Sequence, residues 1–312
     1  MKGKNILVFG GSGQIGRNLI RKLTKNNHRV TAVTRNLHKK GYILKTQGNP
    51  GYIEIIESNI FDEENLNKLI KDKDICINLV GILFEKKNNT FKNIHTNFPY
   101  LLARICKENN LDQFIHVSAL GIEKATDSYY AKSKLEGEKL VKQNFERSII
   151  LKPSIVFSQD DDFSTKFLSL LKLLPFFPIF YNTKFTPIHC TDFSEIIVKV
   201  INRNIFSETI ECVGPQVLTF KEILQILLKL INKKKLLIPM PIIFSKLMIK
   251  LFELMPSPLM TLDQLKLLKY DNILSGNYKS NKDLEMKANL EFEKEVKKYS
   301  FMWKEGGEYS KN

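Results

Sequence analysis

Short apolar runs alternate with amphipathic segments along the first 153 residues. The runs are rich in Ile, Val and Leu, as expected for strands, and they occupy residues 4–9, 29–33, 52–56, 74–81, 113–117 and 148–151. The segments between them carry apolar residues at helical spacing, at 15–23, 62–70, 98–109 and 129–144. Strands that alternate with helices predict an α/β fold built on a doubly wound parallel sheet.

The alternation becomes irregular after Pro153. Residues 154–276 are expected to form a smaller C-terminal α/β lobe, interleaved with the first domain, with helices that begin at Asp192 and Thr219. Each of these two residues is followed three positions later by Glu, which resembles a capping box. Residues 277–312 are rich in Lys and Glu and are expected to be a charged tail, either a surface helix or partly disordered. The predicted division is 1–153, 154–276 and 277–312.

A glycine-rich turn joins the first strand to the first helix. Gly10, Gly13 and Gly16 lie three residues apart, which allows a tight turn, the approach of a pyrophosphate and close packing of helix on strand. In this strand–turn–helix context the motif predicts a Rossmann-type fold and a bound dinucleotide. The residues expected to contact the dinucleotide at this turn are Gly10, Ser12, Gly13, Gln14, Ile15 and Gly16.

The end of the second strand indicates which dinucleotide is bound. NAD-binding proteins place an acidic side chain there for the ribose hydroxyls, whereas this chain has Thr34 and Arg35. A guanidinium suits a 2′-phosphate, so NADP(H) is favoured over NAD(H). The alternative is that Arg35 is a solvated loop residue.

More cofactor contacts are expected at the ends of the later strands, because ligands of open parallel sheets bind beyond the carboxyl ends of the strands. Asn59 and Ile60 follow the third strand, where Asn59 could either hold an adenine amino group or form a turn. The residues that end the fourth strand and should border the cofactor are Leu79, Val80 and Gly81.

A serine and a tyrosine–lysine pair form the candidate catalytic group. Ser118 ends the fifth strand, and Tyr130 and Lys134 follow on a predicted helix. Residues four apart share one helix face, so the Lys134 ammonium is expected beside the Tyr130 phenol. There it would lower the phenol pKa from ~10, letting Tyr130 pass a proton to a carbonyl. His116, inside the fifth strand, is expected to be a hydrogen-bonded core residue.

Composition mainly excludes functional classes. The net charge of +15 would suit nucleic acid, but only seven of the 48 basic residues are Arg and the lysines are scattered, so no nucleic acid partner is expected. The four cysteines have neither metal-type nor redox-type spacing, and no metal site is expected. The chain enters its first strand at once and has no run of ~18 apolar residues. We therefore expect a cytoplasmic protein, either free or peripheral on the cytoplasmic face of the inner membrane.

Together these motifs resemble the extended or atypical short-chain dehydrogenases/reductases, the group of the NAD-dependent epimerases/dehydratases. The matching residues are the turn 10–16, Asn97 on the fourth helix, Ser118, Tyr130 with Lys134, and 152–157. The resemblance implies that Tyr130 and Lys134 contact the nicotinamide ribose and that Pro153 borders the nicotinamide ring. It also implies that Asn97 belongs to the cofactor site.

Over nearly its whole length the chain is similar to one branch of that group, the NADPH-binding accessory subunits of respiratory complex I and their proteobacterial relatives. The segments that carry this resemblance are 78–85, 116–119, 130–138, 161–163, 187–192, 213–215, 237–241, 261–265 and 271–272. The branch implies a cofactor held largely as a structural element, and complex I subunits or the membrane surface as partners. One departure is Ser158, where many relatives have glycine beside the expected nicotinamide.

Two other interpretations stay open. The chain could be a free-standing NADP-dependent reductase or epimerase that acts on a quinone-related, isoprenoid or sugar-nucleotide small molecule. It could also be a cofactor-binding fold without a partner. Epimerases of sugar nucleotides usually bring arginines to the diphosphate, and the smaller lobe has Arg203 and almost no other guanidinium, which counts against that substrate class.

Two apolar stretches of the lobe are candidates for attachment to a partner. In a predicted helix over 244–255, Lys246, Lys250 and Glu253 form a narrow polar stripe beside a wide apolar face. The aromatic loop 175–181 is similarly apolar, and its prolines argue against a central strand. Either both stretches pack into the core of the lobe, or one of them faces a membrane subunit or lipid headgroups.

Overall fold

The predicted parallel sheet forms the centre of the molecule. The computed structural model describes residues 3–255 and 258–307. Its largest sheet has eight strands, all parallel, in the order β14-β11-β6-β5-β4-β1-β2-β3. These strands are β1 (Asn5–Phe9), β2 (Arg29–Thr34), β3 (Ile53–Glu57), β4 (Ile75–Asn78), β5 (Gln113–Val117), β6 (Ser148–Pro153), β11 (Glu208–Cys212) and β14 (Lys279–Ser280).

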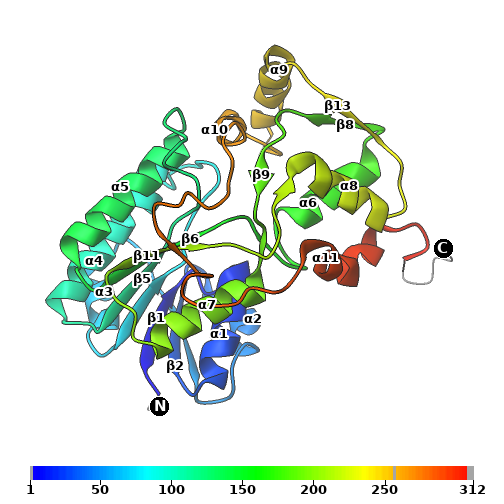
Figure 1. The fold of residues 1–312 in the computed structure, drawn as a ribbon. Coiled ribbons are helices and arrows are strands. Elements are labelled where there is room, and N and C mark those ends of the chain that lie inside the picture. Colours follow the sequence, from blue (N-terminus) through cyan, green and yellow to red (C-terminus); the bar gives the residue numbers. More distant parts are fainter. Residues whose placement is uncertain (1–2, 256–257, 308–312) are drawn as a thin grey trace.

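Helices cover both faces of this sheet, as the doubly wound prediction requires (Figure 1). One face packs against α1 (Gln14–Lys25), α2 (Leu37–Lys45) and α7 (Cys190–Asn202). The other face packs against α3 (Glu63–Ile70), α4 (Phe98–Glu108) and α5 (Tyr129–Asn144). A π-helical turn, η1 (Lys92–Asn97), leads directly into α4. The sheet core is continuous because β1, β4, β5 and β6 are buried almost throughout.

The smaller lobe is built around a separate apolar cluster. Its helices α6 (Ser164–Leu173), α8 (Phe220–Leu230) and α11 (Phe292–Ser300) enclose Phe157 and Phe177. Three two-stranded sheets support the lobe: β7 (Val156–Phe157) with β10 (Ile188–His189), β9 (Lys184–Phe185) with β12 (Leu218–Thr219), and β8 (Phe176–Ile179) with β13 (Leu236–Pro239). Helices α9 (Ile242–Glu253) and α10 (Leu262–Leu267) and the 3-10 turn η2 (Phe301–Trp303) complete it. No helix in the described part of the chain combines the length and apolarity needed to cross a bilayer.

Two local expectations for the lobe are wrong. The segment 175–181 is not simply a loop, because Phe176–Ile179 pairs with Leu236–Pro239. Its prolines are tolerated because this sheet has only two strands. The helix expected to begin at Asp192 is capped by His189, whose Nδ1 accepts from the Thr191 amide, while Asp192 accepts from Leu290. The capping box of Thr219 and Glu222 is confirmed.

The segment after residue 277 also differs from the expected surface helix or disordered tail. Its residues Lys279 and Ser280 add the outermost strand β14 to the large sheet. Phe292, Val296 and Tyr299 recur on one side of α11 and are buried in the lobe cluster. The abundance of Lys and Glu concealed this apolar stripe in the sequence.

Candidate functional site

The glycine turn between β1 and α1 has the geometry of a phosphate-binding loop. Gly10 has a φ of +80°, a conformation that side chains rarely adopt, and a Cβ there would meet Leu79. A Cβ on Gly16 would overlap the carbonyl oxygen of Gly10 and the backbone of Gly11. Gly13 is the N-cap of α1 and offers no side chain to the helix terminus. The first turn of α1 therefore keeps amide groups free for an anion, as a dinucleotide pyrophosphate requires.

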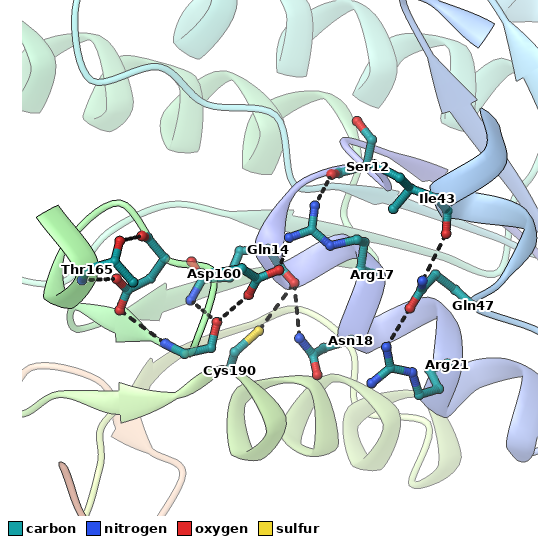
Figure 2. A network of polar contacts seen from close by, with 12 residues as sticks. Ser12, Gln14, Arg17, Asn18, Arg21, Ile43, Gln47, Asp160, Thr165 and Cys190 are labelled. Carbon is teal, nitrogen blue, oxygen red and sulfur yellow. Dashed lines mark hydrogen bonds and ion pairs between the residues drawn. The ribbon is translucent and has the colours of Figure 1, made fainter. Parts of the chain in front are cut away.

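A polar network fixes this turn against the loop that follows β7 (Figure 2). The Arg17 guanidinium donates to the Ser12 carbonyl (2.7 Å) and forms an ion pair with Asp160. The Gln14 amide donates to Ser158 Oγ (3.0 Å), which donates to Asp160 Oδ1 (2.7 Å). Gln14 was predicted to contact the cofactor, but its side chain is hydrogen-bonded to this loop instead. Ser158, the departure noted in the sequence, connects the two segments.

Arg35 lies directly after β2 with an exposed side chain. Among the described residues its guanidinium has no hydrogen-bond or ion-pair partner. The next residue, Asn36, caps α2 by accepting from Lys39 N (2.8 Å). The nearby carboxylate of Glu57, at the end of β3, accepts from Leu37 N (2.6 Å) and so is already engaged. Arg35 is therefore a free cation at the strand end where a dinucleotide ribose is expected.

The ends of β3 and β4 are arranged differently from each other. Asn59 Oδ1 accepts from Phe61 N (3.1 Å), so it forms the turn that was the alternative for this residue, while Ile60 is buried in the core. After β4, Leu79 N donates to Phe9 O (3.0 Å) and places Leu79 against Gly10. The adjoining residues of this strand end are Val80, whose amide donates to Asn78 Oδ1, and Gly81.

Lys134 reaches from α5 to these strand ends. Its Nζ donates to the Val117 carbonyl (3.1 Å), and a Cβ on Gly81 would lie 3.6 Å from it. Burial lowers the pKa of Lys134 to about 8, although the Glu138 carboxylate opposes the shift. The side chain thus joins β4, β5 and α5 at one point.

Tyr130 lies beside Lys134, but their electrostatic relation differs from the prediction. Nζ of Lys134 is 5.9 Å from the centre of the phenol ring. Burial raises the pKa of Tyr130 to about 12, so the expected lowering by the ammonium is wrong. The physical reason is that the ammonium faces the ring from a distance while desolvation acts on the phenolate directly.

Ser118 belongs to a buried ion network, and among the described residues it forms no hydrogen bond with Tyr130. Its Oγ hydrogen-bonds to Glu138 Oε1, which also accepts from Lys152 Nζ (3.0 Å). Lys152 pairs in addition with Glu123, and these carboxylates outweigh its desolvation and raise its pKa. The sequence interpretation missed this network, although Lys152 is a charged residue inside an apolar strand. Pro153 follows it at the carboxyl end of β6.

His95 is a second residue that the sequence interpretation missed. Its Nε2 accepts from Ile82 N (3.1 Å), so the proton of the neutral ring is on Nδ1 and is donated to Ser133 Oγ (3.0 Å). The ring stands edge-on to Tyr130, with centroids 5.1 Å apart. Burial, helped by the Lys134 charge, lowers the pKa of His95 to about 2. His95 is therefore a neutral residue that positions the strand end and α5.

Asn97, predicted to belong to the site, points elsewhere. Its side chain is exposed, and its Nδ2 donates to Asn93 Oδ1 (3.1 Å). The π-helical turn η1 has more residues per turn than an α-helix, so it brings His95 and Thr96 against α5. His116 matches the expected core residue, with Nδ1 at 3.2 Å from Asn78 Nδ2.

A surface groove of about 450 Å³ runs along η1 and α5. Its lining includes Phe91, Thr96, Tyr129 and Ser133. Of the described residues, Tyr129 and not Tyr130 borders this groove. Neither Tyr130 nor Lys134 is among the residues that line this groove.

The amino-acid sequence is similar to subunits of mitochondrial respiratory complexes. The chain is 25% identical over 284 residues to the 40 kDa subunit of mitochondrial NADH-ubiquinone oxidoreductase from Neurospora crassa, covering 90% of this chain and 75% of that protein. It is 26% identical over 281 residues to alpha subcomplex subunit 9 of mitochondrial NADH dehydrogenase (ubiquinone) from Mus musculus, covering 89% and 74%. These matches confirm the branch that the sequence motifs resemble.

The fold itself is similar to that of sugar-nucleotide epimerases. UDP-glucuronic acid 4-epimerase from Bacillus cereus, solved with UDP-glucuronic acid and NAD, has a TM-score of 0.71 at 20% identity, covering 96% of this chain and 99% of that one. The RmlD substrate binding domain matches residues 123–238. The NAD dependent epimerase/dehydratase family matches residues 6–172, more than half of the chain. The chain therefore belongs to the NAD dependent epimerase/dehydratase family.

Proposed function

We propose that this protein is an NADP(H)-holding accessory subunit of a respiratory NADH:ubiquinone oxidoreductase. One observation carries the proposal: the similarity to the Neurospora crassa and mouse subunits extends over 89–90% of the chain and so includes the smaller lobe. A cofactor-binding sheet alone would be shared with any member of the family. Similarity in the lobe supports a common role in assembly.

The cofactor site supports NADP(H) in particular. The turn at Gly10, Gly13 and Gly16 would receive the pyrophosphate, and the unpaired Arg35 would receive the 2′-phosphate. Tyr130 and Lys134 would contact the nicotinamide ribose. When bound, such a cofactor supplies a hydride for reduction of a carbonyl or similar group.

The proposed role of the cofactor is structural. Ser118 is engaged by Glu138 and is unavailable to orient a substrate. The Tyr130 phenol is partly buried, and burial opposes formation of the phenolate that a proton relay would pass through. A bound dinucleotide would instead bridge the ends of β1, β2 and β4 and stabilise them.

A free-standing reductase is the second candidate, and the retained Tyr130–Lys134 pair is the observation that favours it. A sugar-nucleotide substrate is disfavoured by Arg203, the guanidinium expected to serve a diphosphate. Its Nη1 donates to Leu284 O (2.6 Å) and so is bound to the protein's own backbone. A quinone-related or isoprenoid substrate fits this candidate better.

Affinity purification from native membranes tests the proposal. A tagged chain is expressed from its own locus, the membranes are solubilised in mild detergent, and the eluate is assayed for NADH:quinone oxidoreductase activity and NADP(H) content. The proposal expects both to co-purify with the protein. A folded, cofactor-loaded protein that elutes without oxidoreductase subunits would favour the free reductase.

A further inference from the structure

Helix α9 exposes an unusual amount of apolar surface. Of its twelve residues, only Ser245 and Ile249 are buried. The exposed fractions of its large apolar side chains, with that of the following Leu254, are 77% for Ile243, 64% for Phe244, 62% for Leu247, 61% for Leu251 and 82% for Leu254. A core helix of a monomer would bury this stripe, so the apolar face expected from the sequence is not used inside the lobe.

Two stripes share the exposed side of α9. At 100° per residue, Ile243, Leu247 and Leu251 lie on the side opposite Ser245 and Ile249. Lys246 and Lys250, four residues apart, form with Glu253 a second, polar stripe along one edge of the apolar one. Both lysines are exposed, and within the described part of the chain neither has a hydrogen-bond or ion-pair partner. We call these two stripes together the α9 surface.

The neighbouring elements extend the same combination of apolar and basic residues. Leu236 on β13, Phe176 on β8 and Leu173 at the end of α6 are exposed by 73%, 48% and 79%. The exposed lysines of this region are Lys172, next to Leu173, and Lys234, two residues before Leu236. Figure 1 shows α9, β8 and β13 at the end of the molecule opposite the N-terminus. Exposed apolar residues with a lysine close by in the sequence thus occur on several elements of the lobe.

Lysines outnumber carboxylates on α9 by two to one. The carboxylate on α9 is Glu253, and its Oε1 accepts from Leu262 N (2.8 Å), so it caps the following helix. An apolar stripe bordered by free lysines fits an anionic bilayer, in which the side chains enter the acyl boundary while the ammonium groups remain at the phosphates. A protein partner would have to supply its own carboxylates to those lysines.

We infer that the α9 surface binds the interface of an anionic lipid bilayer, with the helix lying parallel to the membrane plane. The inference requires only this surface and is independent of the proposed subunit role. It can therefore hold or fail without deciding whether the protein assembles with an oxidoreductase.

Vesicle flotation of the purified full-length protein tests the inference. Vesicles of phosphatidylcholine are compared with vesicles that also contain phosphatidylglycerol. The pair Leu247→Ser and Leu251→Ser should lower binding to the anionic vesicles by about tenfold or more. The pair Lys246→Gln and Lys250→Gln should lower it by about 25-fold, fivefold per charge, with no effect on binding to neutral vesicles.

Matched controls come from exposed residues elsewhere. Lys107→Gln with Lys139→Gln removes two charges from α4 and α5, and Val217→Ser removes an exposed apolar side chain. These variants should bind as the wild type does. Because all substituted side chains are exposed, thermal unfolding of every variant should match that of the wild type, which separates loss of binding from loss of fold.

The depth to which the α9 surface enters the bilayer is measured by introducing a tryptophan as a fluorophore. Leu251→Trp should be quenched by lipids brominated in the acyl chains, and Val217→Trp should not. Absence of wild-type binding to anionic vesicles, or equal binding by all variants, would overturn the inference. A wild-type dimer that Leu247→Ser and Leu251→Ser dissociate, without vesicle binding, would assign the surface to a second copy of the chain instead.

Discussion

At the scale of single residues, Lys134 controls the electrostatics of the candidate site. It is 4% exposed, and burial lowers its pKa to about 8, whereas an unfolded lysine titrates near ~10.4. Between these values the unfolded chain holds the proton and the folded chain does not. The free energy of unfolding contributed by this group therefore rises with pH across that window.

Lys134→Met removes that contribution. Between ~pH 8 and ~pH 10.4 the wild type should gain about 3 kcal/mol of unfolding free energy relative to the variant, because only the wild type carries the titrating group. Urea unfolding of both proteins at the two ends of the window measures it. A difference that stays constant with pH would show that Lys134 titrates normally.

Tyr130→Phe separates a structural from a chemical role of the phenol. Among the described residues the Tyr130 oxygen has no hydrogen-bond partner, so its removal should leave the melting temperature unchanged. The number of copies of the variant protein per assembled oxidoreductase should also equal that of the wild type. If the wild type reduces a defined substrate and this variant does not, the reductase interpretation gains its main support.

Arg35 should determine the preference between the two dinucleotides. Removing one charge-assisted contact to the 2′-phosphate costs about 1.5–3 kcal/mol, so Arg35→Asp should weaken NADPH binding by about 10- to 100-fold and strengthen NADH binding. Arg29→Asp, at the opposite end of the same strand, is the matched control. Equal calorimetric affinities of the wild type for NADPH and NADH would contradict the assignment.

At the scale of elements, the three glycines of the turn have separable functions. Gly16→Ala forces a Cβ into the backbone of Gly10 and Gly11, and should destabilise the protein by about 3 kcal/mol. A Cβ on Gly13 meets only the Gly10 carbonyl, at 3.3 Å, and Gly13 is the N-cap of α1, where the pyrophosphate is proposed to bind. Gly13→Ala should therefore fold nearly normally and lose about tenfold or more in dinucleotide affinity. Thermal unfolding combined with calorimetric titration distinguishes the two; equal stability of both variants would contradict this division.

The strands β1 to β6 of the large sheet could be predicted because their apolar pattern is strong, whereas β14 lies in the segment whose composition indicated a charged tail. The irregular lobe was harder, since its strands are two to four residues long and their pairing depends on distant segments. At Asp192 the sequence matches a helix cap, but the helix begins earlier, at Cys190, with His189 as its cap. Asp192 instead accepts a hydrogen bond from Leu290 N. Local patterns cannot distinguish these two uses of a carboxylate.

The same limit applies to the site. The structure brings Leu79 against Gly10 and Lys134 close to Gly81, at the strand ends where the rule for parallel sheets places a ligand. The rule could not identify His95, because an unpredicted π-helical turn decides which residue of that segment faces α5. Nor could it show that Ser118 turns to Glu138, since that contact joins residues 20 positions apart in a buried network.

At the scale of the whole molecule, the C-terminal segment joins the two parts of the fold. It contributes β14 to the large sheet and Phe292 to the lobe core. Phe292→Ala should destabilise the protein by about 3–5 kcal/mol, whereas Lys297→Ala, on the exposed side of the same helix, should have almost no effect. Chemical denaturation measures both. Equal stability of the two variants would support the charged, disordered tail that the composition indicated.

The proposed account treats the dinucleotide as a fixed part of the assembled protein. The most direct test loads the protein with NADPH tritiated at the transferable position of the nicotinamide and incubates it with native membranes carrying out NADH oxidation. The account predicts that the label stays on the protein-bound cofactor throughout turnover of the respiratory complex. Transfer of the label to water, quinone or another small molecule, faster than cofactor dissociation, would contradict it and identify the protein as a working reductase.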